Sequence, residues 1–307
     1  MIPAQLATSV EVITSGPRTT VQDLGRPGHA HLGVPTSGAA DQAAYRLANR
    51  LVGNPESAAC LETVLGGAAV RFHGATSIAL TGAPVRATLD GRPMALTQRV
   101  PVRPGQTLRL GTPAHGLLCY VAIRGGVDVA RTLGSAATDT LTGLGPTPLT
   151  SGQHVPVGPA PALEKAPGCS DTAFTPVPSV GPAVLRARLG PRDDRFTPAA
   201  VRALFASGWE VTADTNRVAA RLTGPCLEYA DRGQLRSEGM VTGAIEVPPS
   251  GQPIVFLPDH PTTGGYPVIG VVDAADLGLL AQSRPGTAVR FTPARSPRRR
   301  PTSPPGH

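Results

Sequence analysis

Apolar and polar residues alternate over short stretches along most of the chain. Val10–Ile13 and Ala288–Phe291 are typical, and β-branched residues are frequent at the apolar positions. A period of two with such residues predicts short strands that bury one face. The other stretches of this kind are 69–72, 77–80, 107–110, 117–123 and 184–189. The pattern therefore predicts a mainly β fold.

Helical periodicity is confined to a few segments. The clearest is 41–51, which places Ala44, Leu47 and Ala48 on one face, with Ser37 or Asp41 available to cap its start. Further helices are expected at 198–207, 213–221 and 274–282. The expected fold class is mainly β with a few helices, as in partly open barrels.

Short landmarks recur in the same order along the chain. Gly16-Pro17-Arg18 reappears as Gly190-Pro191-Arg192, and Cys60-Leu61-Glu62 as Cys226-Leu227-Glu228. Four further landmarks behave alike: 50–53 with 221–224, 81–83 with 242–244, 105–106 with 251–252, and Tyr120 and Ile123 with Tyr266 and Ile269. The separation shrinks steadily, so the second copy is shorter. This ordered self-similarity predicts two tandem copies of one domain.

Composition sets the domain boundaries. The 307 residues include 36 Gly and 34 Pro, which suits many turns between short strands. A Pro, Ala and Gly-rich stretch without periodicity, 159–182, is expected to be a linker between domains at 8–158 and 183–292. Residues 293–307 are expected to form a disordered basic tail. Four of its arginines supply more than half of the net charge of +7, so no nucleic-acid partner is expected.

Several chemistries are excluded by composition. Lys165 is the only lysine and lies in the predicted linker, so a P-loop, a Schiff base and covalent biotin on this chain are all excluded. The four cysteines show no C-x-x-C pair and the histidines no ligand spacing, so no metal site is expected. Neither a signal peptide nor a membrane span is apparent, which makes the cytoplasm the expected location.

The first candidate site is a glycine-containing turn near the end of the chain. After the apolar strand 254–257 come Thr262, Thr263, Gly264, Gly265 and Tyr266. Paired glycines let successive backbone N–H groups face one concavity and let a ligand approach closely. This turn is expected to form one wall of a cleft, together with a short polar segment and flanking residues: Ser237, Glu238, Glu246 and Gln252. Glu238 and Glu246 are the candidate bases and Thr263 a catalytic candidate; the alternative is an ordinary hairpin turn.

A second candidate site lies in the first copy. Gln22, Asp23 and Arg26 follow the first strand, and Ser37, Gly38 and Asp41 lead into the helix 41–51. Of these, Asp23 is a catalytic candidate and the others are candidates for anion binding. A hydroxyl-bearing helix start offers free N–H groups and a positive dipole end to a carboxylate or phosphate, and Arg26 could clamp it. The alternative is structural, with Ser37 and Asp41 capping the helix and Asp23 pairing with Arg26.

Several motifs together resemble one known family, the second subunit of the allophanate-hydrolase-type or biotin-dependent carboxyltransferase family. It includes the C component of bacterial 5-oxoprolinase, the Kip antagonist and the carboxyltransferase part of urea amidolyase. The resemblance runs from about residue 10 to 292 and rests on these segments: 20–26, 37–41, 48–54, 133–135 with 138–139, 243–245, 251–254 and 262–267. It implies two tandem cyclophilin-like β-barrels. It also implies a related partner of the allophanate hydrolase subunit 1 family and a lactam-utilisation subunit.

The resemblance also implies an activity. The chain would be a subunit of an ATP-dependent 5-oxoprolinase, a hydrolase that opens the lactam to glutamate and works in complex, with ATP held jointly with a partner. The lactam oxygen would be phosphorylated before water adds, and the protein would stabilise the oxyanion. Two alternatives stay open: carboxyl transfer from carboxybiotin to urea or a similar amide, and a non-enzymatic regulator that binds its partner.

Three positions depart from the family pattern. Glu246 stands where the family usually has Gln. The run Ser135–Asp139 lacks the arginine that the family places after the serine, and Gly145-Pro146-Thr147 replaces Gly-Gly-Arg. The departures concern anion-binding groups, so they bear on the substrate and leave the expected fold unchanged.

Overall fold

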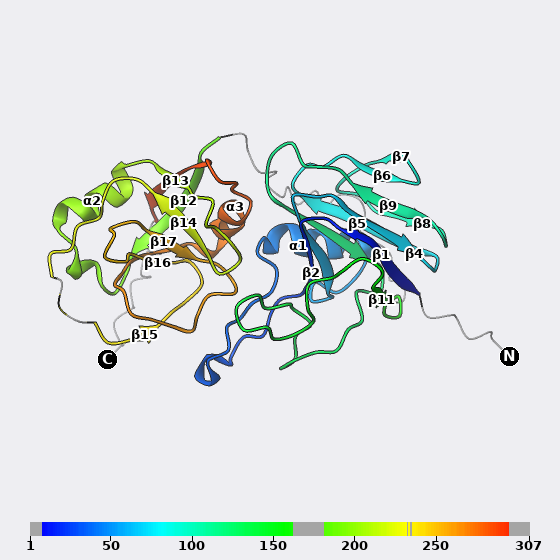
Figure 1. Ribbon diagram of the computed structural model, residues 1–307, viewed down its shortest axis with the longest axis horizontal. Helices are drawn as coiled ribbons and strands as arrows, with labels where there is room; N and C mark the ends of the chain where they lie inside the picture. The colour runs from blue at the N-terminus through cyan, green and yellow to red at the C-terminus, as the bar shows by residue number, and fades with distance from the viewer. Residues whose placement is uncertain (1–7, 162–180, 232, 234, 295–307) are drawn as a thin grey trace, which may run out of the picture.

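The structure is a computed structural model that describes residues 8–161, 181–231, 233 and 235–294. Figure 1 shows two β-rich halves side by side, with helix α1 of the first half and helix α3 of the second facing the junction between them. The mainly β fold expected from the alternating pattern is confirmed, with three α-helices among the described residues.

The first half is built from two antiparallel sheets. One has the order β11-β1-β4-β9-β6-β7 and the other β2-β3-β10-β5-β8. Their apolar faces enclose a core that includes Val10, Phe72, Leu80, Leu108 and Ile123. The strands are β1 (Ser9–Ser15), β2 (Arg18–Gln22), β3 (Cys60–Val64), β4 (Ala68–Phe72), β5 (Thr76–Gly82), β6 (Ala87–Leu89), β7 (Arg92–Met94), β8 (Val100–Val102), β9 (Thr107–Leu110), β10 (Leu118–Ile123) and β11 (His154–Pro156).

The second half is a closed seven-stranded barrel in the order β12-β19-β16-β17-β14-β13-β20. It closes through the parallel pairing of β12 with β20 and fills its interior with a separate core, including Leu185, Leu204 and Phe291. A two-stranded ribbon of β15 and β18 lies outside the barrel sheet. The strands are β12 (Ala183–Leu189), β13 (Trp209–Val211), β14 (Ala219–Thr223), β15 (Glu238–Gly239), β16 (Ala244–Glu246), β17 (Ile254–Phe256), β18 (Thr263–Gly264), β19 (Val268–Val272) and β20 (Ala288–Pro293).

Three of the four expected helices form. Helix α1 (Gln42–Val52) begins where Asp41 accepts a hydrogen bond from the Ala44 amide at 3.1 Å, and Thr197 caps α2 (Pro198–Ala206) in the same way. Helix α3 (Leu277–Ala281) follows the 3₁₀ turn η3 (Ala274–Asp276). Two other 3₁₀ turns are η1 (Ala30–Leu32) and η2 (Asp193–Arg195).

The helix expected at 213–221 is wrong. Asn216 Oδ1 accepts hydrogen bonds from the amides of Val218 and Ala219, at 2.8 and 3.3 Å, and so turns the chain. Strand β14 then begins at Ala219 and pairs with β13 and β17. A side chain that competes for backbone amides favours a turn over a helix, which overrides the weak helical pattern.

The repeat is only partly reflected in the structure. Gly16-Pro17 and Gly190-Pro191 each follow the first strand of their half. In contrast, 50–53 ends a helix and 221–224 ends a strand, so that landmark pair does not mark equivalent positions. Among the described cysteines, Cys60 and Cys119 are buried, whereas Cys226 is exposed. The predicted linker and tail lie largely outside the described residues, and the domain boundaries stay predictions. Within the described residues no helix is both long and apolar enough to span a membrane.

Candidate functional site

Where the two halves meet, one arginine of the second half is buried among acidic groups of both. Arg217, between β13 and β14, forms ion pairs with Glu62 of β3 and with Asp259, whose Oδ2 is 2.9 Å from Nε. All three residues are almost inaccessible to solvent. Burial alone would raise the pKa of Asp259, but the Arg217 charge and hydrogen bonds from Arg217, Ser37 and Thr140 hold it below its ordinary value. The guanidinium is paired with two carboxylates, and the cluster is structural in kind.

Three residues of the second candidate site belong to this junction. Ser37 Oγ donates to Asp259 Oδ1 at 2.7 Å, and the Gly38 carbonyl accepts from Arg217 at 2.5 Å. Asp41 accepts from Gln282 of the second half at 2.9 Å while capping α1, and burial raises its pKa. Their polar atoms are thus directed at the other half of the chain, and an anion would have to displace these contacts.

The other three residues of that site join two loops. Asp23 accepts hydrogen bonds from Ser135 Oγ at 2.6 Å and from the Ala136 amide at 2.7 Å. Buried Arg26 donates to the carbonyls of Thr132 and Ala137, and Gln22 donates to the Thr138 carbonyl at 3.0 Å. The pairing of Asp23 with Arg26, weighed from sequence, is not the arrangement observed. These groups hold the loop after β2 against the loop 131–145.

The glycine-containing turn and the Glu238 segment do come together, as expected. Strand β15 pairs with β18, with Glu238 opposite Gly264 and Gly239 opposite Thr263. Glu238 forms a two-pronged ion pair with Arg192, which leaves its carboxylate committed to that partner. Ser237, Thr263 and Gly265 are exposed, and Tyr266 is 45% exposed, so the tip of the ribbon faces solvent.

Glu246, beneath this turn, is the unusual group. It is only 6% exposed, and among the described residues it has no ion pair and a single hydrogen bond, from the Tyr266 amide to Oε1 at 3.1 Å. Burial raises the pKa of Glu246, and the Tyr266 hydrogen bond offsets this in part. A buried, unpaired carboxyl beside an exposed turn is the kind of group that clusters at functional sites.

Gln252 lies apart from the turn. Its amide pairs with Gly224, accepting from the Gly224 amide at 2.8 Å and donating to the Gly224 carbonyl at 3.1 Å. The structure thus ties Gln252 to the end of β14. Thr262 contributes its backbone carbonyl, which accepts from the Met240 amide at 2.9 Å.

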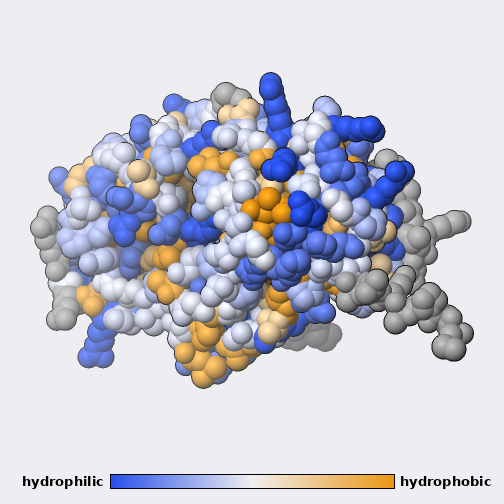
Figure 2. Space-filling view, turned by 45° about the vertical axis from the view of Figure 1, so that its right-hand side comes forward, coloured by the Kyte–Doolittle hydropathy of each residue, from blue (hydrophilic) through white to orange (hydrophobic). Residues whose placement is uncertain are grey.

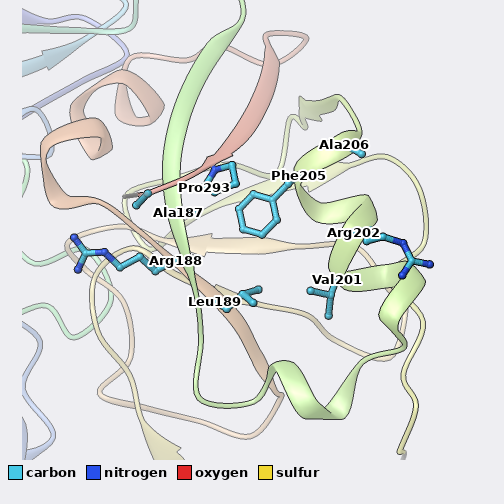
Figure 3. Close-up of a pocket in the computed structure, with 9 residues that line it drawn as sticks. Ala187, Arg188, Leu189, Val201, Arg202, Phe205, Ala206 and Pro293 are labelled. Carbon is cyan, nitrogen blue, oxygen red and sulfur yellow. The ribbon is translucent and has the colours of Figure 1, made fainter. Parts of the chain in front are cut away.

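A cavity of about 870 Å³ opens elsewhere on the second half, between α2 and strands β12 and β20. Figure 3 shows Phe205 projecting from α2 toward Pro293, while the guanidinium groups of Arg188 and Arg202 extend outward on opposite sides. None of the residues singled out from sequence lines it. It is a separate feature of the second half.

Sequence reasoning missed the residues that close the junction. Arg217 lay inside the wrongly expected helix 213–221, and its partner Glu62 is 155 residues away. Asp259 stands directly before the candidate turn, and that position was its only signal. Gln282 ends an expected helix, with nothing local to indicate that it binds Asp41 and the amides of Leu117 and Leu118.

Comparison with known families gives a match to the carboxyltransferase domain, subdomains A and B, over residues 32–293. The chain belongs to this family. It is 37% identical to the C component of 5-oxoprolinase from Escherichia coli, over 92% of this chain and 90% of that one. It is 32% identical to urea amidolyase of Saccharomyces cerevisiae, over 93% of this chain and 17% of that protein.

Solved structures give the same family likeness. The crystal structure of urea amidolyase from K. lactis superposes on 95% of this chain with a TM-score of 0.89 and 29% identity, and the match covers 19% of that protein. The chain therefore spans about a fifth of urea amidolyase and nearly the whole length of the 5-oxoprolinase C component.

Proposed function

We propose that this chain is the C component of an ATP-dependent 5-oxoprolinase, which opens the lactam 5-oxoproline to glutamate together with partner subunits. The observation that carries the proposal is the extent of the match: 92% of this chain aligns with 90% of the C component of the E. coli 5-oxoprolinase. Urea amidolyase matches the chain with only a small part of its length.

The substrate would bind at the β15–β18 turn above Glu246. An ideal Cβ on Gly265 meets no atom within 4 Å, so there is open space at the tip of the turn. Glu246 Oε2 has no hydrogen-bond partner among the described residues. In its neutral form the carboxyl would donate a hydrogen bond to the lactam oxygen, where negative charge develops on attack. The Gln that relatives usually carry there could donate in the same way.

ATP does not fit the candidate site of this chain alone. Arg192 is engaged by Glu238, Arg217 by Glu62 and Asp259, and Arg26 by backbone carbonyls. Arg236, exposed beside Ser237, has no ion pair among the residues that the structure describes, but a single arginine offers little charge for a triphosphate. The triphosphate would be held by a partner subunit of the allophanate hydrolase subunit 1 type or by the lactam-utilisation subunit.

A second candidate function is carboxyl transfer to urea or a similar amide. The observation that favours it is the close superposition on the K. lactis urea amidolyase. In that role it would receive carboxybiotin from a carrier outside the given sequence, because its only lysine, Lys165, lacks the sequence context of a biotin carrier.

Reconstitution with the products of neighbouring genes distinguishes these functions. The complex should form glutamate from 5-oxoproline with stoichiometric release of ADP, and neither partner alone nor this chain alone should do so. ADP release that needs urea and bicarbonate, with no glutamate, would replace the proposal with the carboxyltransferase. A complex that forms but turns over neither substrate would favour a regulator.

The turn is tested in the same assay. Thr263→Ala combined with Glu238→Ala should lower glutamate formation, while exchange of exposed Glu210 on β13 for Gln should not. Unchanged activity of the double variant in an intact complex would refute the placement of the substrate at the turn, though not the oxoprolinase activity itself.

A further inference from the structure

The pairing of three neighbouring strands gathers a second polar cluster, far from the turn. On the edge of the six-stranded sheet Glu11 of β1 stands directly opposite His154 of β11, and on its other side opposite Arg71 of β4. Directly opposed residues on antiparallel strands point to the same face. His73 lies two residues beyond Arg71 and therefore shares this face, while its amide extends the ladder to the Ser9 carbonyl.

The three side chains are close enough to share a ligand. Glu11 Oε2 lies 3.2 Å from His73 Nε2, and the rings of His73 and His154 are 5.1 Å apart. One ligand atom from each residue can be chosen so that all lie within 4.8 Å of one another. Bonds of about 2.0–2.1 Å place the ligand atoms of a tetrahedral zinc ion roughly 3.4 Å apart. The three side chains would have to move only slightly closer together to bind such an ion. They have room to do so, because the side chain of Glu11 is 22% exposed and that of His73 is 40% exposed.

We propose that Glu11, His73 and His154 form a binding site for a divalent transition-metal ion of the zinc class. Two imidazoles and one carboxylate suit Zn²⁺, Co²⁺, Ni²⁺ or Cu²⁺, whereas Mg²⁺ and Ca²⁺ prefer oxygen ligands throughout. Water would complete the coordination. The three ligands come from three adjacent strand segments, so the bound ion ties β11 and the end of β4 to β1.

Arg71 competes with the metal for Glu11. Its Nη1 lies 3.3 Å from the same oxygen, Glu11 Oε2, that faces His73. Metal binding must displace this guanidinium and bring a second positive charge near it. We therefore expect that removal of the Arg71 charge strengthens metal binding. Zinc bound at unrelated surface groups would not respond to this substitution.

Sequence spacing could not reveal this site, because its members lie far apart along the chain and only strand register brings them together. The sequence-based expectation of no metal site rested on local spacing alone. Adventitious zinc binding elsewhere, at exposed Cys226 or exposed His31, is the background against which the site has to be measured.

The test is zinc titration of the full chain, without an affinity tag, by calorimetry and by the visible spectrum of the Co²⁺ form, in a Cys226→Ser background. We expect one Zn²⁺ per chain. The association constant should fall at least tenfold in His73→Gln and in His154→Gln, and it should rise in Arg71→Gln. The Co²⁺ bands should weaken in the two histidine variants and persist in His31→Gln. Zinc should raise the melting temperature of the wild type, because binding to the native state stabilises it.

Two results would overturn the proposal. One is equal zinc affinity and stoichiometry in the wild type and both cluster variants, which would show adventitious binding only. The other is weaker binding in Arg71→Gln with an unchanged melting temperature, which would show that Arg71 supports the cluster and competes with nothing.

Discussion

At the scale of single residues, two buried charged groups lead to opposite interpretations. Arg217 is enclosed by Glu62 and Asp259, so its charge is compensated and its hydrogen bonds are used. Glu246 is similarly buried but has one hydrogen bond and no ion pair within the part of the chain described. Burying an unpaired ionisable group costs stability, so a group that is kept in such a setting is a candidate for a functional role. Compensation, more than burial, separates the structural group from the candidate functional one.

Glu246→Gln should remove the pH dependence that ionisation of Glu246 gives to the stability and the activity of the protein. Because burial raises the pKa of Glu246 above the ordinary 4.5, the native state binds this proton more tightly than the unfolded chain does. The stability it contributes is thus complete below pH 4.5 and falls as pH rises through the native pKa. The variant should become relatively more stable with increasing pH in urea unfolding. It should also keep oxoprolinase activity at pH values where the wild type declines.

Glu246→Leu, which cannot donate a hydrogen bond, should lose activity throughout. Glu210→Gln, an exposed exchange on β13, is the matched control and should follow the wild type. Parallel stability curves for Glu246→Gln and the wild type would contradict the raised pKa.

Arg217→Met should destabilise the protein strongly. The exchange leaves Glu62 and Asp259 buried without their cation, and breaking a buried pair in this way costs about 3–5 kcal/mol. The matched control is Arg46→Gln, because Arg46 and its partner Glu56 are 36% and 39% exposed, and such a pair is worth about 0–1 kcal/mol. Urea unfolding monitored by circular dichroism measures both. Similar losses in the two variants would show that the junction gains little from Arg217.

At the scale of elements, the β15–β18 ribbon places the candidate site on the rim of the barrel. An ideal Cβ on Gly264 would lie 2.5 Å from Glu246 Oε1 and 2.8 Å from Met240 Cε, whereas Gly265 next to it has free space. The first glycine therefore lets the strand approach the buried carboxyl. The second leaves room at the tip.

Gly264→Ala should displace the Glu246 carboxylate and lower activity, and Gly265→Ala should do so much less. The atoms in the way are the ends of flexible side chains, so the cost in stability should stay at or below about 1–3 kcal/mol. Comparison of kcat/KM and melting temperature for the two variants checks this. An equal effect of both substitutions would show that backbone flexibility, and not the contact with Glu246, is what matters.

The loops 23–37 and 131–145 form a second element of interest. Asp23 and Arg26 hold them together, yet Leu32, Leu133 and Leu141 on these loops are 60%, 41% and 46% exposed. Figure 2 shows apolar surface gathered along the lower edge of the molecule in that view. Exposed apolar side chains on ordered loops are typical of protein interfaces.

The proposed function predicts that these loops bind a partner subunit. Leu32→Ser with Leu141→Ser should weaken assembly of the complex at least tenfold, measured by calorimetry with the isolated partner, while the melting temperature of the chain alone stays unchanged. Val184→Ser is the control, since Val184 is 49% exposed on the second half. Unaltered affinity of the double variant would place the interface elsewhere.

At the scale of the whole molecule, the junction makes the two halves depend on each other. Besides the Arg217 cluster, Gln282 contacts Asp41 and Leu118, and Arg284 donates to the carbonyls of Gly116 and Pro113 at 2.6 Å. Many of these contacts involve charged groups in a buried setting, where each is stronger than at the surface. The halves should therefore unfold together at neutral pH.

Acid should weaken the contact between the two halves by protonating Asp259. The pKa of Asp259 is held below the ordinary 3.8, so its contribution is complete above that value and is lost as pH falls toward the native pKa. In unfolding measurements from roughly pH 6 to pH 2, the Asp259 contribution to the free energy should stay level above 3.8 and fall below it. Asp259→Asn should be less stable at neutral pH and less sensitive to acid, unlike the exposed exchange Asp128→Asn. Equal acid slopes in all three proteins would contradict the role of Asp259.

Much of the fold could be predicted because its signals are local. Alternation over a few residues predicted the strands, and the apolar stripe of 41–51 predicted helix α1. The sequence offered Ser37 or Asp41 as its cap, and the structure shows that Asp41 caps it. The Glu238 segment was also expected to lie beside the glycine turn, and strand pairing brings the two together. The helix at 213–221 failed because Asn216 binds two backbone amides, and propensity does not weigh that competition.

The mainly β class, the main helices and the family could be inferred from the sequence, since each depends on neighbouring residues or on motifs that keep their order along the chain. Contacts between distant residues set which polar groups find a hydrogen-bond or ion-pair partner. Ser37, Asp41 and Arg217 meet partners from the other half, and Glu11 meets two histidines through strand register. Such pairings depend on contacts between residues far apart in the chain, and local preferences carry no information about them.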